Sequence, residues 1–152
     1  MLPDEVDILL VEANPLEVEL ILRPLTESFP GIRIGLARDG EEALDYLLGR
    51  GPFRHRLGGP LPRLILLELK LPKVDGIEVL RSIRGSHRTS TAPVVVLTSI
   101  AEPRELAQCY SLGANSCVQK PIAFDQFQET LLTLGRYWLA FNQAPPAAVQ
   151  AT

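Results

Sequence analysis

The chain has 152 residues, of which 46% are hydrophobic and 22% charged, and this size and balance are those of one globular domain. Its formal net charge of −3 argues against a nucleic-acid-binding surface, and its two cysteines are too few for a disulfide framework. No apolar run approaches the roughly 20 residues of a membrane span, and the first residues lack a signal-peptide pattern, so we expect a cytoplasmic protein.

Short apolar runs alternate with amphipathic segments along the chain. The apolar runs, which predict buried strands, cover 6–11, 32–37, 64–67, 93–97 and 116–119. A segment with helical periodicity follows each run, beginning after Asn14, after Asp39, after Asp75, at Pro103 and at Phe124. This alternation predicts the α/β class, as a doubly wound (βα)5 three-layer sandwich around a five-stranded parallel sheet. The predicted domain covers 6–141, between an N-terminal extension at 1–5 and a disordered tail at 142–152.

The helix starts carry local signals. Asn14 is a preferred N-cap residue, and Pro15 suits the first helical position because no N–H is needed there. Pro24 should kink or shorten this first helix, because it lacks an N–H and its ring crowds the preceding turn. Capping-box pairs precede the second and third helices: Asp39 with Glu42, and Asp75 with Glu78.

The last helix, predicted over 124–141, has more apolar surface than one face can bury. The stripe expected against the sheet consists of Phe124, Phe127, Leu131, Leu134, Trp138 and Phe141. Leu132 and Leu139 lie on a second face, with Tyr137 near it. Because one domain buries only one helix face, we expect these three residues to form a homodimer interface.

Polar residues stand where the predicted strands end. In chain order they are Glu12, Glu68, Thr98 with Ser99, and Lys120 with Pro121. The carboxyl ends of parallel strands meet at one edge of a sheet, where doubly wound folds have their functional crevice. Any one of these residues could be no more than a polar strand end. Two carboxylates, a hydroxyl and an ammonium together predict a site.

The segments around these strand ends resemble the receiver domain of two-component response regulators. The matching stretches are 8–12, 37–43, 71–76, 96–99, 113–115 and 120–121. The arginine-rich segment before the third strand and the aromatic end of the last helix are similar to phytochrome-associated regulators. The resemblance implies a CheY-like, flavodoxin-like strand order 2-1-3-4-5 and a histidine kinase as partner. The likeness to phytochrome-associated regulators suggests a kinase of the phytochrome type.

The resemblance also assigns roles to the strand-end residues. The family's phosphoacceptor is the acidic residue that ends the third strand, and this position is Glu68. Thr98 would bond the phosphoryl oxygen, and Lys120 would neutralise its charge. The bond from Lys120 to Pro121 is one that the family usually keeps cis, so we expect a cis peptide there.

Two positions depart from the family pattern. Mg²⁺ would be held by Glu12, Glu68 and the backbone carbonyl of Lys70, but Ala13 replaces the second acidic residue after the first strand. Glu68 is one methylene longer than the usual Asp, and a misplacement of about 1 Å can cost about 100-fold in rate. We therefore expect weak Mg²⁺ binding and a receiver that is phosphorylation-deficient or phosphomimetic. The alternative is a pseudo-receiver that acts only as an interaction module, and neither reading predicts an enzyme.

Two further features leave alternatives open. The segment 49–63 contains Arg50, Arg54, His55, Arg56 and Arg63 and no acidic residue. It could bind an acidic surface of a kinase or could equally be a solvated loop. Cys109 and Cys117 are predicted to be packing residues, and Cys117 stands where many receivers have a switching aromatic residue.

Overall fold

The five apolar runs form one parallel sheet in the computed structural model, which describes residues 2–99 and 102–146. The strands are β1 (Ile8–Val11), β2 (Ile34–Ala37), β3 (Leu64–Leu67), β4 (Val94–Thr98) and β5 (Ser116–Gln119). Their order in the sheet is β2-β1-β3-β4-β5, and every neighbouring pair is parallel. The predicted doubly wound sandwich and its strand order 2-1-3-4-5 are thereby confirmed.

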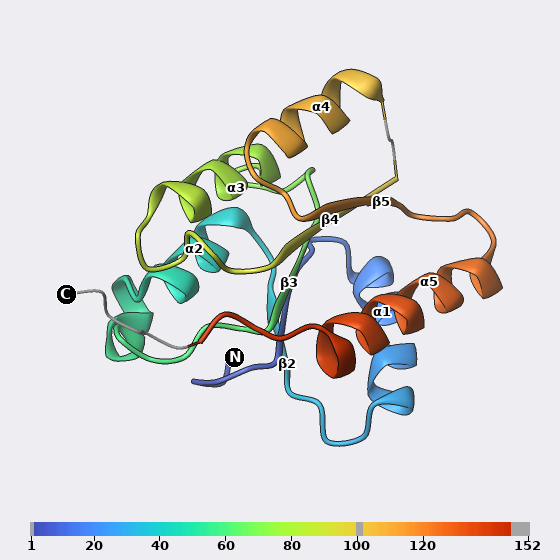
Figure 1. Ribbon diagram of the computed structural model, residues 1–152, viewed down its shortest axis with the longest axis horizontal. Helices are drawn as coiled ribbons and strands as arrows, with labels where there is room; N and C mark the ends of the chain where they lie inside the picture. The colour runs from blue at the N-terminus through green and yellow to red at the C-terminus, as the bar shows by residue number, and fades with distance from the viewer. Residues whose placement is uncertain (1, 100–101, 147–152) are drawn as a thin grey trace.

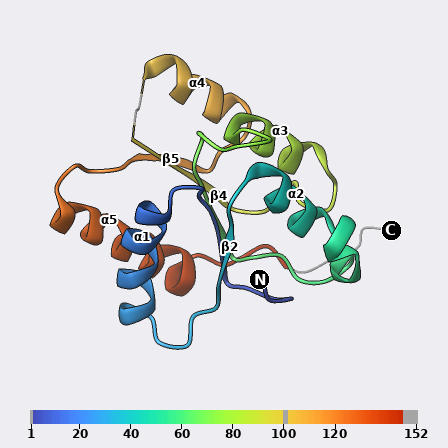
Figure 2. The same cartoon turned by 180° about the vertical axis from the view of Figure 1, so that it is seen from behind.

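Helices cover both faces of the sheet (Figure 1). They are α1 (Pro15–Ser28), α2 (Gly40–Leu48), α3 (Gly76–Gly85), α4 (Pro103–Ser111) and α5 (Phe124–Arg136), with a 3-10 helix η1 (Gly51–Arg56) and a π-helical turn η2 (Tyr137–Phe141). Helices α1 and α5 pack together on one face, and α2, α3 and α4 lie on the other, as the view from behind in Figure 2 also shows. Strands β1, β3 and β4 are buried along their whole length, which explains their unbroken apolar sequences.

The predicted caps form as side-chain hydrogen bonds. Asn14 accepts from the Leu16 N–H at 2.9 Å, and Asp39 accepts from the Glu42 N–H at 2.7 Å. Asp75 makes the equivalent bond to the N–H of Glu78 at 3.0 Å. Each cap places a helix start directly after the loop at a strand's carboxyl end, so the loops of the crevice are fixed at both ends.

Pro24 does not shorten the first helix, contrary to our expectation. Helix α1 continues through it to Ser28. Pro24 is buried together with Ile21 and Leu25, and this apolar contact offsets the hydrogen bond that its missing N–H removes.

The last helix changes type before its predicted end. It is α-helical to Arg136 and then makes one π-helical turn, in which the Asn142 N–H donates to the Tyr137 carbonyl at 2.7 Å. The wider turn rotates the following residues away from the α-helical pattern. Leu139 therefore packs against the core and does not lie on the predicted outer face, whereas Phe141 is exposed instead of buried. Phe124, the first residue of the predicted sheet-facing stripe, is also exposed.

One arginine of the segment 49–63 is internal. Arg56 is only 3% exposed and donates to the carbonyls of Asp4 at 2.8 Å and Pro60 at 3.0 Å, and also to the carbonyl of Tyr46. Its guanidinium carbon lies 3.6 Å from the centroid of the Tyr46 ring. For Arg56, neither the docking nor the solvated-loop reading is correct, because it holds this segment onto the fold.

The N-terminal segment adjoins this region. Leu2, in the predicted extension, is buried in the core, and the Pro3 carbonyl accepts a hydrogen bond from the Tyr46 hydroxyl at 2.7 Å. The predicted tail at 142–152 lies outside the described residues from 147 onward. Within the described ranges, no helix combines the length and the apolar character needed to cross a bilayer.

Candidate functional site

The polar strand ends meet at one edge of the sheet, as their order predicts. Glu12 follows β1, Glu68 follows β3, Thr98 ends β4 and Lys120 follows β5. The Lys120 ammonium lies between the two carboxylates, with Nζ 2.9 Å from Glu12 Oε1 and 2.7 Å from Glu68 Oε1. We call Glu12, Lys120 and Glu68 the ion-pair triad.

Burial makes this pairing obligatory. Glu12 is 3% exposed and Lys120 is 7% exposed, and only 11% of the Glu68 side chain is accessible. A charge removed from water at such a position is stable only when an opposite charge or several hydrogen bonds compensate it. A third carboxylate, that of Glu17 on α1, lies 3.6 Å from the same ammonium.

The remaining carboxylate oxygens bond to backbone N–H groups. Glu12 Oε2 accepts from the Asn14 N–H at 3.2 Å. Glu68 Oε2 accepts from the Leu69 N–H at 2.7 Å and from the Lys70 N–H at 3.4 Å. All four oxygens of Glu12 and Glu68 are therefore engaged within the chain.

The protonation of Lys120 follows from these contacts. Burial by itself would lower the pKa of the ammonium, but the hydrogen bonds and charges of Glu68 and Glu12 outweigh it. The net effect raises the pKa of Lys120 above its ordinary value, so the ion pairs persist at neutral pH.

Lys120 reaches the crevice through a trans peptide bond. The cis bond expected between Lys120 and Pro121 is absent. The Lys120 backbone N–H donates to the Thr98 carbonyl at 2.8 Å, which ties the end of β5 to the end of β4. This bond and the two carboxylates place the side chain without the cis geometry. Thr98 itself is buried at the same edge.

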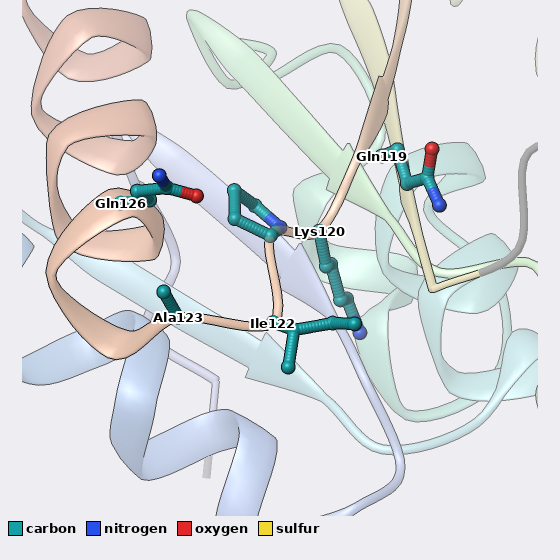
Figure 3. Close-up of a pocket in the computed structure, with 6 residues that line it drawn as sticks. Gln119, Lys120, Ile122, Ala123 and Gln126 are labelled. Atoms are coloured by element: carbon teal, nitrogen blue, oxygen red, sulfur yellow. The ribbon is translucent and has the colours of Figure 1, made fainter.

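Lys120 also borders an open hollow between β5 and α5. Figure 3 shows this hollow, which is lined by Gln119, Lys120, Pro121, Ile122, Ala123 and Gln126. Ile122 is fully exposed at this place. The hollow thus adjoins the ion-pair triad on the surface side.

The residues at the predicted metal position do not fit Mg²⁺. An octahedral ion needs oxygen ligands that are free to coordinate it, and the carboxylates of Glu12 and Glu68 are already bonded to Lys120 and to backbone N–H groups. Ala13 has no side-chain oxygen to offer. Across residues 2–99 and 102–146, no group of three or more His, Cys, Asp or Glu side chains is arranged to hold a metal ion.

Sequence reasoning missed Glu17 and used Asn14 only as a cap. The signal was present, because Asn14 and Glu17 have the spacing that places Glu17 in the first turn of α1, directly above the strand ends. A carboxylate in that turn faces the same crevice as Glu12. Four charged side chains, and not three, therefore determine the local field.

The two cysteines pack between α4 and β5. Cys109 is buried and Cys117 half-buried, and burial raises the pKa of the Cys109 thiol to about 11. The Tyr110 hydroxyl accepts a hydrogen bond from the Cys117 N–H at 3.2 Å. The aromatic side chain that contacts β5 is therefore Tyr110 of α4, and not a residue at position 117.

Comparison with protein families and curated proteins places the chain among regulators. A family model described as the response regulator receiver domain matches residues 8–132. The probable methanogenesis regulatory protein FilR2 of Methanothrix harundinacea is 44% identical over 93% of this chain and 88% of its own length. The response regulator Rcp1 of Synechocystis is 31% identical over 92% of this chain and 93% of its own length.

Solved structures agree with this placement. The phosphorylated cyanobacterial phytochrome response regulator RcpA is similar with a TM-score of 0.86 and 32% identity, over 93% of this chain and 99% of that chain. The bacteriophytochrome response regulator AtBRR is similar with a TM-score of 0.71 and 45% identity, over 93% of this chain and 100% of that chain.

Proposed function

The chain belongs to the response regulator receiver family, and we propose that it regulates by protein contacts in one fixed state, without accepting a phosphoryl group. The observation that carries this proposal is the state of Glu68, which stands at the phosphoacceptor position. One of its oxygens is 2.7 Å from the Lys120 ammonium, and the other is 2.7 Å from the Leu69 N–H.

This arrangement opposes phosphoryl transfer at two points. An acceptor oxygen must be free to attack in line, and misplacement by about 1 Å can cost about 100-fold in rate. Both oxygens of Glu68 are engaged, and its extra methylene moves them from where an aspartate would hold them. The transferring group also needs a metal ion to offset its charge, and the oxygens that would hold one are bonded to Lys120.

Glu68 can instead stand in for a phosphorylated acceptor. Its carboxylate takes a charge-assisted hydrogen bond from Lys120 and two from backbone N–H groups, contacts that a phosphoryl group's oxygens would also make. It carries about half the charge of a phosphoryl group. We therefore propose that the loops of the crevice are held permanently near one signalling state.

The proposed partner is a histidine kinase, and the names of the similar regulators suggest the phytochrome type. Binding would not require phosphoryl transfer. The protein would therefore bind the kinase and leave the phosphoryl group on it. A cytoplasmic location fits the two free cysteines, because oxidising compartments favour disulfides. We propose no catalytic activity for the chain itself. The second candidate is a pseudo-receiver, in which the pair of Glu68 and Lys120 is structural, mimics no signalling state, and leaves the chain as an interaction module only.

The experiment that tests the main proposal is an intact-mass measurement. The protein is incubated with Mg²⁺ and acetyl phosphate, and its mass should not change. A stoichiometric gain of about 80 Da that maps to Glu68 would overturn the proposal.

We also propose that the chain forms a homodimer through the end of α5. Tyr137 is 49% exposed and Phe141 67% exposed, so this end presents aromatic surface to solvent, with the half-buried Leu132 one turn earlier. Light scattering should give about twice the 16.7 kDa of the chain. Tyr137→Asp should give the monomer, whereas Leu139→Asp is unsuitable because Leu139 packs on the core.

A further inference from the structure

The arginines of this chain are unevenly distributed along the sequence. The segments 46–67 and 79–99 together contain seven arginines and both histidines, but no aspartate or glutamate. The rest of the chain therefore carries the other eight of the 15 Lys and Arg residues against all 18 Asp and Glu residues. The two segments are thus strongly basic, although the chain as a whole has a formal net charge of −3.

The fold brings the two basic segments together. Arg88, in the loop between α3 and β4, donates from Nε to a carbonyl in α2 at 3.0 Å. Its Nη2 donates to the carbonyl of Arg56 at 3.1 Å and to that of Gly59 at 3.2 Å, so this loop lies against η1. Figure 1 shows η1 directly after α2. We call the surface formed by 50–59 and 86–91 the basic surface.

Internal hydrogen bonds hold the basic surface in one conformation. Arg56 donates to three backbone carbonyls, and Arg88 donates to three others. These bonds anchor the backbone of η1 from inside, which a freely solvated loop would lack. A preformed surface loses less conformational entropy when a partner binds, so its exposed side chains are well placed for recognition.

Most of the positive charge of the basic surface has no ion-pair partner. Two carboxylates outside it each pair with one of its side chains, Arg50 at 3.4 Å and His55 at 2.8 Å. In the part of the chain that the structure describes, no carboxylate lies within ion-pair distance of Arg54, Arg56 or Arg88. Unpaired cations held close together attract anionic groups from solution.

An apolar side chain lies among these cations. Leu57, at the end of η1, is 67% exposed, and its N–H donates to the carbonyl of the exposed Arg54 at 3.2 Å. Protein–protein interfaces often combine an apolar centre with arginine. Phe53 packs edge-on against the buried ring of Tyr46, with centroids 5.3 Å apart, and is not available as a stacking platform for nucleic-acid bases. The composition therefore favours a protein partner.

We propose that the basic surface binds a carboxylate-rich segment of a partner protein, with Arg54 as its exposed cation and Leu57 as its apolar contact. Arg56 and Arg88 shape the surface and add to its positive potential from behind. Both parts of the surface precede strands, β3 and β4, so it lies toward their amino ends and away from the ion-pair triad. The proposal therefore goes beyond the proposed function and does not depend on it.

The test measures binding of a fluorescent peptide, made of glutamates around one leucine, to the full chain by fluorescence anisotropy. The wild-type protein should bind this peptide, and added NaCl should weaken the binding, because salt screens exposed charges beyond about 10 Å at 0.1 M. Arg54→Glu should weaken the binding about fivefold to tenfold, since attraction is replaced by repulsion. Leu57→Ser should weaken it about fivefold through the lost apolar contact.

The matched control is Arg23→Glu, the same charge reversal at an exposed arginine of α1, which covers the other face of the sheet from α2. This variant should change the affinity for the peptide by less than about twofold. Both arginine variants should unfold at the wild-type midpoint, because each replaces an exposed side chain.

Three results would overturn the proposal. They are no detectable binding of the peptide by the wild-type protein, an equal loss of affinity in Arg23→Glu, and tighter binding of an oligothymidylate at the same salt concentration. A wild-type dimer that Arg54→Glu converts into a monomer would overturn it as well, because the partner would then be a second copy of this chain. None of these results depends on whether Glu68 accepts a phosphoryl group, which the mass measurement decides separately.

Discussion

Two buried cations lie at opposite ends of the sheet, and their partners differ in kind. Lys120 stands at the carboxyl ends of the strands among carboxylates, whereas Arg56 lies at the amino ends among backbone carbonyls and the Tyr46 ring. Backbone carbonyls cannot titrate and cannot be changed by mutation, so the Arg56 contacts serve the fold. The partners of Lys120 are side chains, so a single substitution can change the charge around it. The chemistry of the site can therefore differ between relatives without a change of fold.

The largest loss of stability should come from a substitution at the amino ends of the strands. Arg56→Ala removes hydrogen bonds to three carbonyls and the contact with the Tyr46 ring, and should cost about 3–5 kcal/mol of unfolding free energy. Urea titration measures this loss. Arg54→Ala, two residues away and exposed, is the control and should stay within about 0.5 kcal/mol. Equal effects of the two variants would contradict the assignment of Arg56 as the internal residue.

A smaller and pH-dependent loss of stability should come from a substitution at the carboxyl ends of the strands. Glu68→Gln removes a partner of Lys120 whose side chain is only 11% exposed, and should cost about 1–3 kcal/mol near pH 8. Because the folded-state pKa of Lys120 is raised, the stability from this pair is complete below the unfolded pKa of about 10.4 and is lost as pH rises through the folded value.

The stability costs of substitutions at the two ends of the sheet should therefore respond differently to high pH. The difference between wild type and Glu68→Gln should narrow above about pH 10.5, whereas the cost of Arg56→Ala should persist, because the backbone carbonyls that Arg56 bonds do not titrate. Urea titrations at pH 8 and pH 11 make the comparison. A Glu68→Gln cost that does not fall at the higher pH would show that the ion pair is not what stabilises this end.

The smallest effect should come from an exposed cation at the same edge as Lys120. Lys73 lies 3.7 Å from Asp39 and 3.8 Å from Glu41, but its side chain is 60% exposed. Solvent screens such pairs, so Lys73→Gln should change stability by no more than about 0.5 kcal/mol. A loss as large as that of Glu68→Gln would mean that pairing alone, and not burial, determines the cost.

The sequence predicted the sheet well, because strands buried on both faces have unbroken apolar runs. It also brought Glu12, Glu68, Thr98 and Lys120 to one edge, since parallel strands order their ends. A contact between Lys120 and Glu68 could be anticipated from the sequence, but the bond from Lys120 to Glu12, 108 positions earlier, could not, because it depends on side-chain reach in the folded crevice.

Other features depended on local geometry that composition does not encode. Arg54 and Arg56 look equivalent in the sequence, and only the 3-10 helix η1 decides that Arg56 points inward. Similarly, the position of Leu139 follows from a π-helical turn, which the α-helical periodicity of the preceding residues does not predict.

The central claim is that Glu68 and Ala13 together keep the acceptor site from phosphoryl transfer. The most direct measurement compares intact masses after incubation with Mg²⁺ and acetyl phosphate for wild type, Ala13→Asp, Glu68→Asp and the double variant. We predict a gain of about 80 Da in the double variant, little in either single variant and none in wild type, because acceptor and metal ligands act as a unit. A phosphorylated wild-type protein, or a folded double variant that stays unmodified, would contradict the account.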